Sequence, residues 1–164
     1  MGAVASFYLL PKTALAGLRD AAPRVAGLTG TDEDPYWDSY WRYLEQHGRE
    51  VVGFQQTGYV FGALLPYLSE QLGMSFKSEY DEFGLFLTEV RQVSHFVLTD
   101  EHRLAYLDSL SSHRFSETAL GEFFNELYAD SEPEAGSMML AAVGALTKAL
   151  AHLDGSSVIV VSVG

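Results

Sequence analysis

The sequence predicts a single domain of the mixed α/β (α+β) class, in which a small mixed sheet is packed by about five or six helices. Apolar, β-prone segments lie near both chain ends, at 3–9 and 158–163, and we expect them to be strands of one sheet. Most segments between them carry apolar residues at three- and four-residue spacing, which is typical of helices. No repeat or linker divides the 164 residues, so one domain spanning 1–164 is expected.

A first helix is predicted directly after the strand at 3–9. Pro11 suits its first position, because the N–H that proline lacks has no partner there. Leucines at helical spacing follow until Pro23 ends the element. The glycine-bearing stretch 24–33 is then expected to be a loop.

A second helix is predicted over 35–47. Asp34 is a favourable N-cap residue, and Gly48 follows the helix where glycine is commonly found. The segment 50–56 is interpreted as a short strand or an extended linker.

A third helix is predicted over 57–72, because a broad apolar stripe runs along it and Gly73 follows. Pro66 lies inside this helix, where its ring would clash with a carbonyl one turn back. A kink or two short helices are therefore expected. The charged stretch 77–82 should be a surface connection.

The next segments are harder to assign from periodicity. The run 83–87 is interpreted as a strand. For 88–98, Val90, Val93 and Val97 fit a helix, whereas alternation through His95 fits a strand; the helix is preferred.

Three helices and a strand complete the chain. Asp100 opens the first of these helices, since acids favour a helix N-terminus, and Ser116 caps the second. After an acidic loop at 129–136, the last helix covers 139–153. Consecutive β-branched residues in 158–163 indicate a strand covered on both faces.

The charge and composition exclude several classes of function. A formal net charge of −12 disfavours binding to DNA or RNA and favours a basic protein partner. The chain has no cysteine, which excludes disulfides and thiolate metal sites and suits a reducing cytoplasm. No apolar run is long enough for a membrane span, and no secretory signal is recognised. We therefore expect a cytoplasmic protein.

No catalytic or cofactor motif is present. The sequence contains no phosphate loop, dinucleotide fingerprint or nucleophile elbow. The five histidines are isolated from one another and lack metal-binding spacing. No cofactor and no metal site are therefore predicted, and a non-enzymatic role is favoured over an enzymatic one.

The aromatic residues of the helix at 35–47 are the most distinctive feature. Trp37, Trp41 and Leu44 share one face, which is predicted to pack into the core. The neighbouring face collects the phenols and one histidine: Tyr36, Tyr40, Tyr43 and His47. Tyrosines of this kind either border the core or line an interface, because they combine an apolar ring with a polar tip.

Both ends of the chain resemble the YfbM-like family of bacterial proteins. The resemblance lies in "MGAVASFYLLPKTALAGL", "EHRLAYLDSLSSHRF", "LYADSEP" and the terminal helix leading into "SSVIVVSVG". It covers about the first twenty and the last sixty residues, while the aromatic helix departs from the family's pattern. The resemblance implies a small bacterial cytoplasmic α/β domain and no catalytic residues.

The sequence is compatible with three functions. The leading hypothesis is a non-enzymatic interaction protein, such as an immunity-type protein, which binds a basic partner through the tyrosine face and the acids Asp32, Glu33 and Asp34. The alternative is a small-molecule binder or enzyme with a pocket beside the aromatic helix. Its candidate polar groups are Tyr40, His47, Gln55, Gln56 and His95. A third is a subunit that self-associates through exposed aromatic residues.

Overall fold

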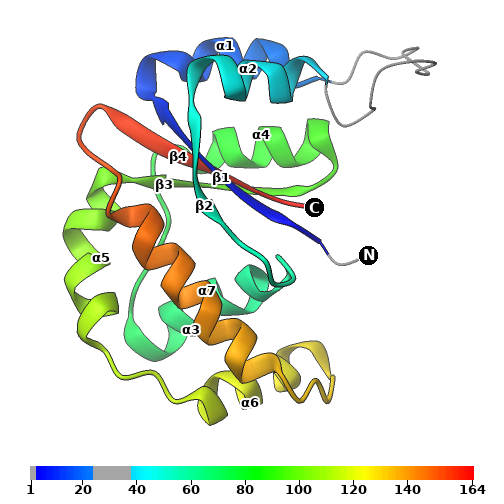
Figure 1. Cartoon of the computed structure of the whole chain (residues 1–164), viewed down its shortest axis with the longest axis vertical. Helices are drawn as coiled ribbons and strands as arrows, with labels where there is room; N and C mark the ends of the chain where they lie inside the picture. Colours follow the sequence, from blue (N-terminus) through cyan, green and yellow to red (C-terminus); the bar gives the residue numbers. More distant parts are fainter. Residues whose placement is uncertain (1–2, 24–37) are drawn as a thin grey trace.

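The computed structural model describes residues 3–23 and 38–164, which contain four strands, seven α-helices and one 3-10 turn (Figure 1). In chain order the elements are β1 (Ala5–Pro11), η1 (Lys12–Ala14), α1 (Leu15–Ala21), α2 (Ser39–His47), β2 (Arg49–Gly53), α3 (Val60–Leu72), α4 (Asp81–Arg91), β3 (Ser94–Thr99), α5 (Asp100–Ser112), α6 (Glu117–Tyr128), α7 (Ala135–Leu150) and β4 (Ser157–Val163).

The strands form one sheet in the order β2-β1-β4-β3. The expected mixed α/β class is confirmed, but the sheet differs from the expected mixed one because every neighbouring pair is antiparallel. The two strands near the chain ends, β1 and β4, pair at its centre from Ala5 opposite Val163 to Pro11 opposite Ser157. All of β4 is buried, as its β-branched run predicted.

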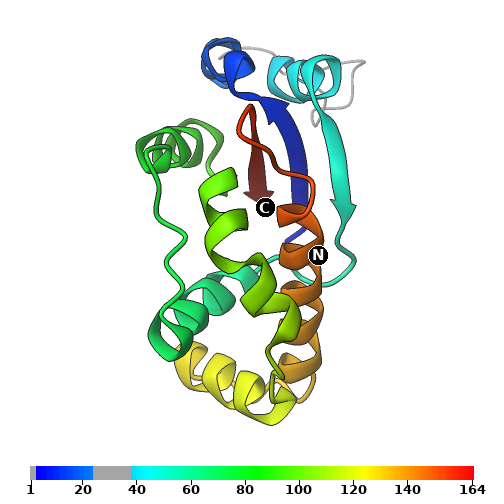
Figure 2. The ribbon, with the colours of Figure 1, turned by 90° about the vertical axis from the view of Figure 1, so that its left-hand side faces the viewer.

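Helices cover both faces of the sheet, which gives three layers (Figures 1 and 2). Alternate residues of a strand point to opposite faces, so Phe7, Ile159 and Val161 pack with α3, α6 and α7 in the larger core. Leu10 and Val160 point the other way and pack with α1, α2 and α4 in the smaller core. Both faces of β4 are therefore buried, whereas Ser6, Tyr8 and Leu9 of β1 stay partly exposed.

Two of the predicted elements are wrong. The run 83–87, expected to be a strand, lies within helix α4, and its apolar residues pack at helical spacing against the smaller core. The segment 88–98, expected to be a helix, divides: α4 ends at Arg91, Gln92 adopts the left-handed conformation with φ of 58°, and β3 begins at Ser94. The chain reverses too sharply there for one helix to continue.

Helix α3 passes through Pro66 as one element, so the expected division into two short helices does not occur. Six of its residues are buried against neighbouring elements, and this packing outweighs the backbone hydrogen bond that proline cannot donate. The helix ends at Gly73, as predicted, where φ is 66°.

Candidate functional site

A pocket of about 490 Å³ opens on the α2 face of the sheet, beside the aromatic helix. Its floor comes from the sheet: Ser6 and Tyr8 of β1 and Ser162 of β4. These three residues occupy alternate positions that share a face with Leu10 and Val160. One end of this sheet face is thus polar, whereas the other end is apolar and covered by helices.

Helix α2 supplies one wall of the pocket, and the end of α4 supplies another. The residues of these walls are Tyr40, Trp41, Glu45, Arg91 and Val93. Tyr40 and Leu44 lie one turn apart and are both buried, so the centre of the buried face of α2 lies between them. Trp41 flanks this centre and is half-buried, which leaves its ring in the pocket.

A buried hydrogen-bond relay lies behind the pocket. Tyr40 is only 1% exposed, and its hydroxyl lies 2.9 Å from Nε2 of His95 on β3. Nδ1 of His95 lies 2.8 Å from the carbonyl oxygen of Val93, which can only accept a hydrogen bond. Nδ1 therefore carries the proton in the neutral ring, and Nε2 accepts from the Tyr40 hydroxyl.

Burial keeps both members of this relay neutral. Burial lowers the pKa of His95 to about 4, although the hydrogen bond to Val93 and the charge of Arg91 also act on it. Burial likewise raises the pKa of Tyr40 above its ordinary value, against the opposing effects of Arg91 and of a hydrogen bond from Ser162. At neutral pH the relay holds a phenol and an uncharged imidazole.

Arg91 is a buried cation whose charge is matched. Its Nη1 donates to Oδ2 of Asp38 at 2.6 Å and to the carbonyl oxygen of Ala22 at 3.0 Å. Its guanidinium lies 4.5 Å from the centre of the Tyr40 ring. Asp38 also caps α2 by accepting from the N–H of Tyr40. The Arg91 side chain therefore joins α4 to the end of α1 and to the start of α2.

Two carboxylates stand at the mouth of the pocket. Tyr8 lies opposite Glu50 across the β1–β2 pair, because a bulge leaves Val51 without a partner and shifts the register by one residue. Glu45 reaches the same place from α2. Burial, then Glu50 and then Glu45, raise the pKa of the Tyr8 phenol, so both carboxylates act on this one ring.

The structure separates the predicted site residues. Asp32, Glu33, Asp34 and Tyr36 lie outside the described residues. Tyr40 lines the pocket and is buried, so of the two alternatives for the tyrosine face it packs into the core and is not part of an exposed interface. The reason is that Leu44 falls between Trp41 and the tyrosines on the helix surface, which turns Tyr40 toward the sheet.

Two other predicted residues form a separate contact. The Tyr43 hydroxyl donates to the carbonyl oxygen of Ala14 at 2.8 Å, and its ring stacks on His47 with centroids 4.1 Å apart. Tyr43 thus joins α2 to η1, directly before α1, and His47 is exposed beside it. Gln55 and Gln56 are exposed and do not line the pocket, whereas His95 joins it through Tyr40.

Sequence reasoning missed Ser162, Tyr8 and Arg91. The signal for Ser162 is present, since a serine interrupts a run of β-branched residues and must face one side of a buried strand. Arg91 has no local signal, because its partner Asp38 is 53 residues away.

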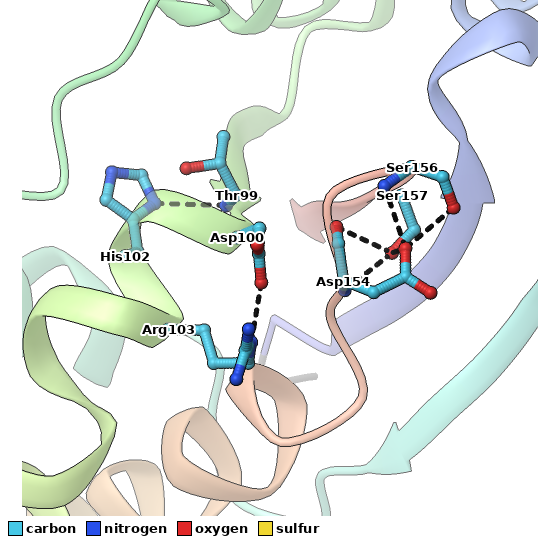
Figure 3. Close-up of polar contacts among 7 residues, drawn as sticks. All are labelled: Thr99, Asp100, His102, Arg103, Asp154, Ser156 and Ser157. Atoms are coloured by element: carbon cyan, nitrogen blue, oxygen red, sulfur yellow. Dashed lines mark hydrogen bonds and ion pairs between the residues drawn. The ribbon is translucent and has the colours of Figure 1, made fainter.

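A second polar cluster lies at the opposite end of the sheet (Figure 3). Asp154 accepts hydrogen bonds from Ser156 and Ser157 in the turn before β4, and Asp100 pairs with Arg103 at 2.5 Å at the start of α5. The two carboxylates thus find their partners locally, in the turn before β4 and in the first turn of α5. They explain how β3 leads into α5 and α7 into β4, and they leave the pocket beside α2 as the better candidate.

Among residues 3–23 and 38–164, no group of three histidine, aspartate or glutamate side chains could hold a metal ion together. Within the same ranges, no helix has both the length and the hydropathy that crossing a membrane requires.

No protein-family model, curated protein or solved structure matches this chain. The resemblance to the YfbM-like family therefore stays a prediction.

Proposed function

We propose that this chain is a non-enzymatic binding protein that holds a small amphipathic ligand in the pocket between α2 and the sheet. One observation carries the proposal: the pocket of about 490 Å³ combines aromatic walls with hydroxyl and carboxylate groups at its floor and mouth. Ligand sites in proteins commonly have this composition and a volume of this order.

The chemistry of the relay favours binding over catalysis. Both ring nitrogens of His95 already have partners, and a pKa of about 4 makes the ring a weak base at neutral pH. The raised pKa of Tyr40 keeps its phenol protonated and therefore a weak nucleophile. The relay instead fixes the orientation of the groups that face a ligand.

A blocked pocket tests this proposal. Val4 is 58% exposed at the pocket rim, so Val4→Trp should fill the entrance without disturbing the core. Leu85→Trp is the matched control, because Leu85 is 68% exposed on α4 and does not line the pocket. A fragment library is screened against the wild-type chain and both variants by saturation-transfer NMR. Hits lost only in Val4→Trp support the proposal; a screen without such hits refutes it.

An interaction protein for a basic partner remains a second candidate. The specific observation is that Glu45 and Glu50 are exposed at an open mouth on a chain with a net charge of −12. A lysine or arginine side chain of a partner would reach the pocket there. Pull-down from the native host at low and high salt tests this role. Capture of a basic protein that is lost at high salt and in Val4→Trp supports it, and unchanged capture by Val4→Trp contradicts it.

A further inference from the structure

The direction of the hydrogen bonds decides what the back of the pocket offers to a ligand. Val93 accepts from His95, and His95 accepts from Tyr40. The proton of the Tyr40 hydroxyl therefore points toward His95 and away from the pocket that Tyr40 lines. The Tyr40 oxygen has no proton left to donate to a ligand, and the back of the pocket favours a ligand group that donates.

The charged side chains around the pocket also favour a ligand group that donates hydrogen bonds and carries a positive charge. Three charged residues line it, namely Arg91, Glu45 and Glu50. Arg91 is matched by Asp38 and by a backbone carbonyl, and its guanidinium faces the Tyr40 ring. In the described ranges of the chain, no cation lies within ion-pair distance of Glu45 or Glu50. The unmatched charge at the mouth is thus negative.

The aromatic walls complete the arrangement. Tyr8 and Trp41 lie side by side, with ring centroids 6.1 Å apart and planes tilted by 58°. Aromatic faces attract cations, and the attraction strengthens where water is excluded. A group placed against these rings would also lie close to the two carboxylates that raise the Tyr8 pKa.

We infer that the ligand of this pocket is an organic cation, whose ammonium or guanidinium group meets Glu45 and Glu50 while its apolar part lies against Tyr8 and Trp41. This inference rests on the proposed function. A free amine and a lysine or arginine side chain of a partner share this chemistry, and the two sources are separated by experiment.

Three probes of nearly equal shape test the charge. 2-Phenylethylamine, 2-phenylethanol and phenylacetate are titrated into the wild-type chain, with chemical-shift changes of pocket residues as the readout. The amine should bind at least about tenfold more tightly than the alcohol, since a cation–π contact and two partly exposed ion pairs each contribute a fraction of that difference. Phenylacetate should bind most weakly.

Isosteric variants locate the effect. In Glu45→Gln/Glu50→Gln the amine should lose its advantage while the alcohol binds as before. Glu70→Gln/Glu126→Gln is the matched control, because both residues are exposed on helices that cover the other face of the sheet. It removes the same amount of charge and should leave all three affinities unchanged.

The outcomes separate this inference from the proposed function. Equal binding of the three probes, lost in Val4→Trp, overturns the preference for a cation and leaves a ligand pocket. Binding of none of the probes overturns both. A further arm uses Nα-acetyl-lysine N-methylamide: binding as tight as that of the amine points to a partner's side chain, and much weaker binding points to a free amine.

Discussion

The Tyr40 hydroxyl donates to Nε2 of His95 across 2.9 Å, between a helix and a strand that are 55 residues apart in the chain. The contact lies behind the pocket and ties α2 to β3 over the two central strands. The same hydrogen bond therefore stabilises the packing of α2 on the sheet and fixes the position of Tyr40 in the candidate site.

Tyr40→Phe should destabilise the protein by about 1–3 kcal/mol, because it leaves a buried acceptor without a partner. The ring is retained, so packing changes little. Tyr59→Phe serves as the control, since Tyr59 is 62% exposed. Urea denaturation measures both variants. An equal midpoint for wild type and Tyr40→Phe would show that the relay contributes no stability.

The depressed pKa of His95 predicts a stability that depends on pH. The folded chain binds the His95 proton only near pH 4, whereas the unfolded chain binds it near the ordinary pKa of 6.5. Stability from this group is therefore full above pH 6.5 and falls as the pH drops from 6.5 toward 4. The loss should be about 2–3 kcal/mol, from about 1.4 kcal/mol for each pH unit.

His95→Gln isolates this effect from the titration of carboxylates. Glutamine still offers an acceptor to Tyr40 but does not titrate in this range. The free energy of unfolding is measured at pH 7 and pH 4.5 for both proteins. The difference between the two pH values should be smaller in the variant. A difference of the same size in both proteins would assign the acid sensitivity to other groups.

Much of the fold follows from local patterns. The strands near the chain ends and the helices after Asp100 and Ser116 carry strong periodicity or caps, and the structure has them where expected. The assignment of 83–87 fails because a short run with four apolar residues fits a strand and a buried helix equally well. The assignment of 88–98 as a helix is also wrong. The strand β3 begins only after Gln92, and no sequence motif indicates the left-handed conformation of that residue.

The site is less predictable than the fold. A pocket beside the aromatic helix was anticipated, and Tyr40 lines it. The assignment of faces failed because spacing alone does not fix the centre of the buried face, and Leu44 shifts it toward Tyr40. His95 could not be oriented while its strand was assigned as a helix. Arg91 and Asp38 meet only through tertiary packing.

Two glycines of α7 should respond in opposite ways to alanine. A Cβ at Gly136 would collide with the backbone carbonyl of Glu117, where α7 crosses α6, whereas a Cβ at Gly144 would meet nothing within 4 Å. Gly136→Ala should therefore cost about 3 kcal/mol through forced separation of the helices. Gly144→Ala should stabilise by about 0.5–1 kcal/mol, because alanine favours the helix. Thermal unfolding of both variants measures the contrast, and a shift in the same direction would contradict the close crossing.

Asp38→Asn separates two roles of one side chain. Asparagine caps a helix as well as aspartate does, so the start of α2 should persist. Arg91, whose side chain is only 5% exposed, would lose its matching charge. The expected cost is about 2 kcal/mol, below the range for a fully buried pair because the Asp38 side chain is 24% exposed.

Asp108→Asn, at an exposed position of α5, is the control for the loss of one negative charge. Chemical denaturation measures both variants. Equal stability of the two would mean that Asp38 acts on α2 only as a cap, and that the Tyr40 ring and the Ala22 carbonyl suffice to hold Arg91.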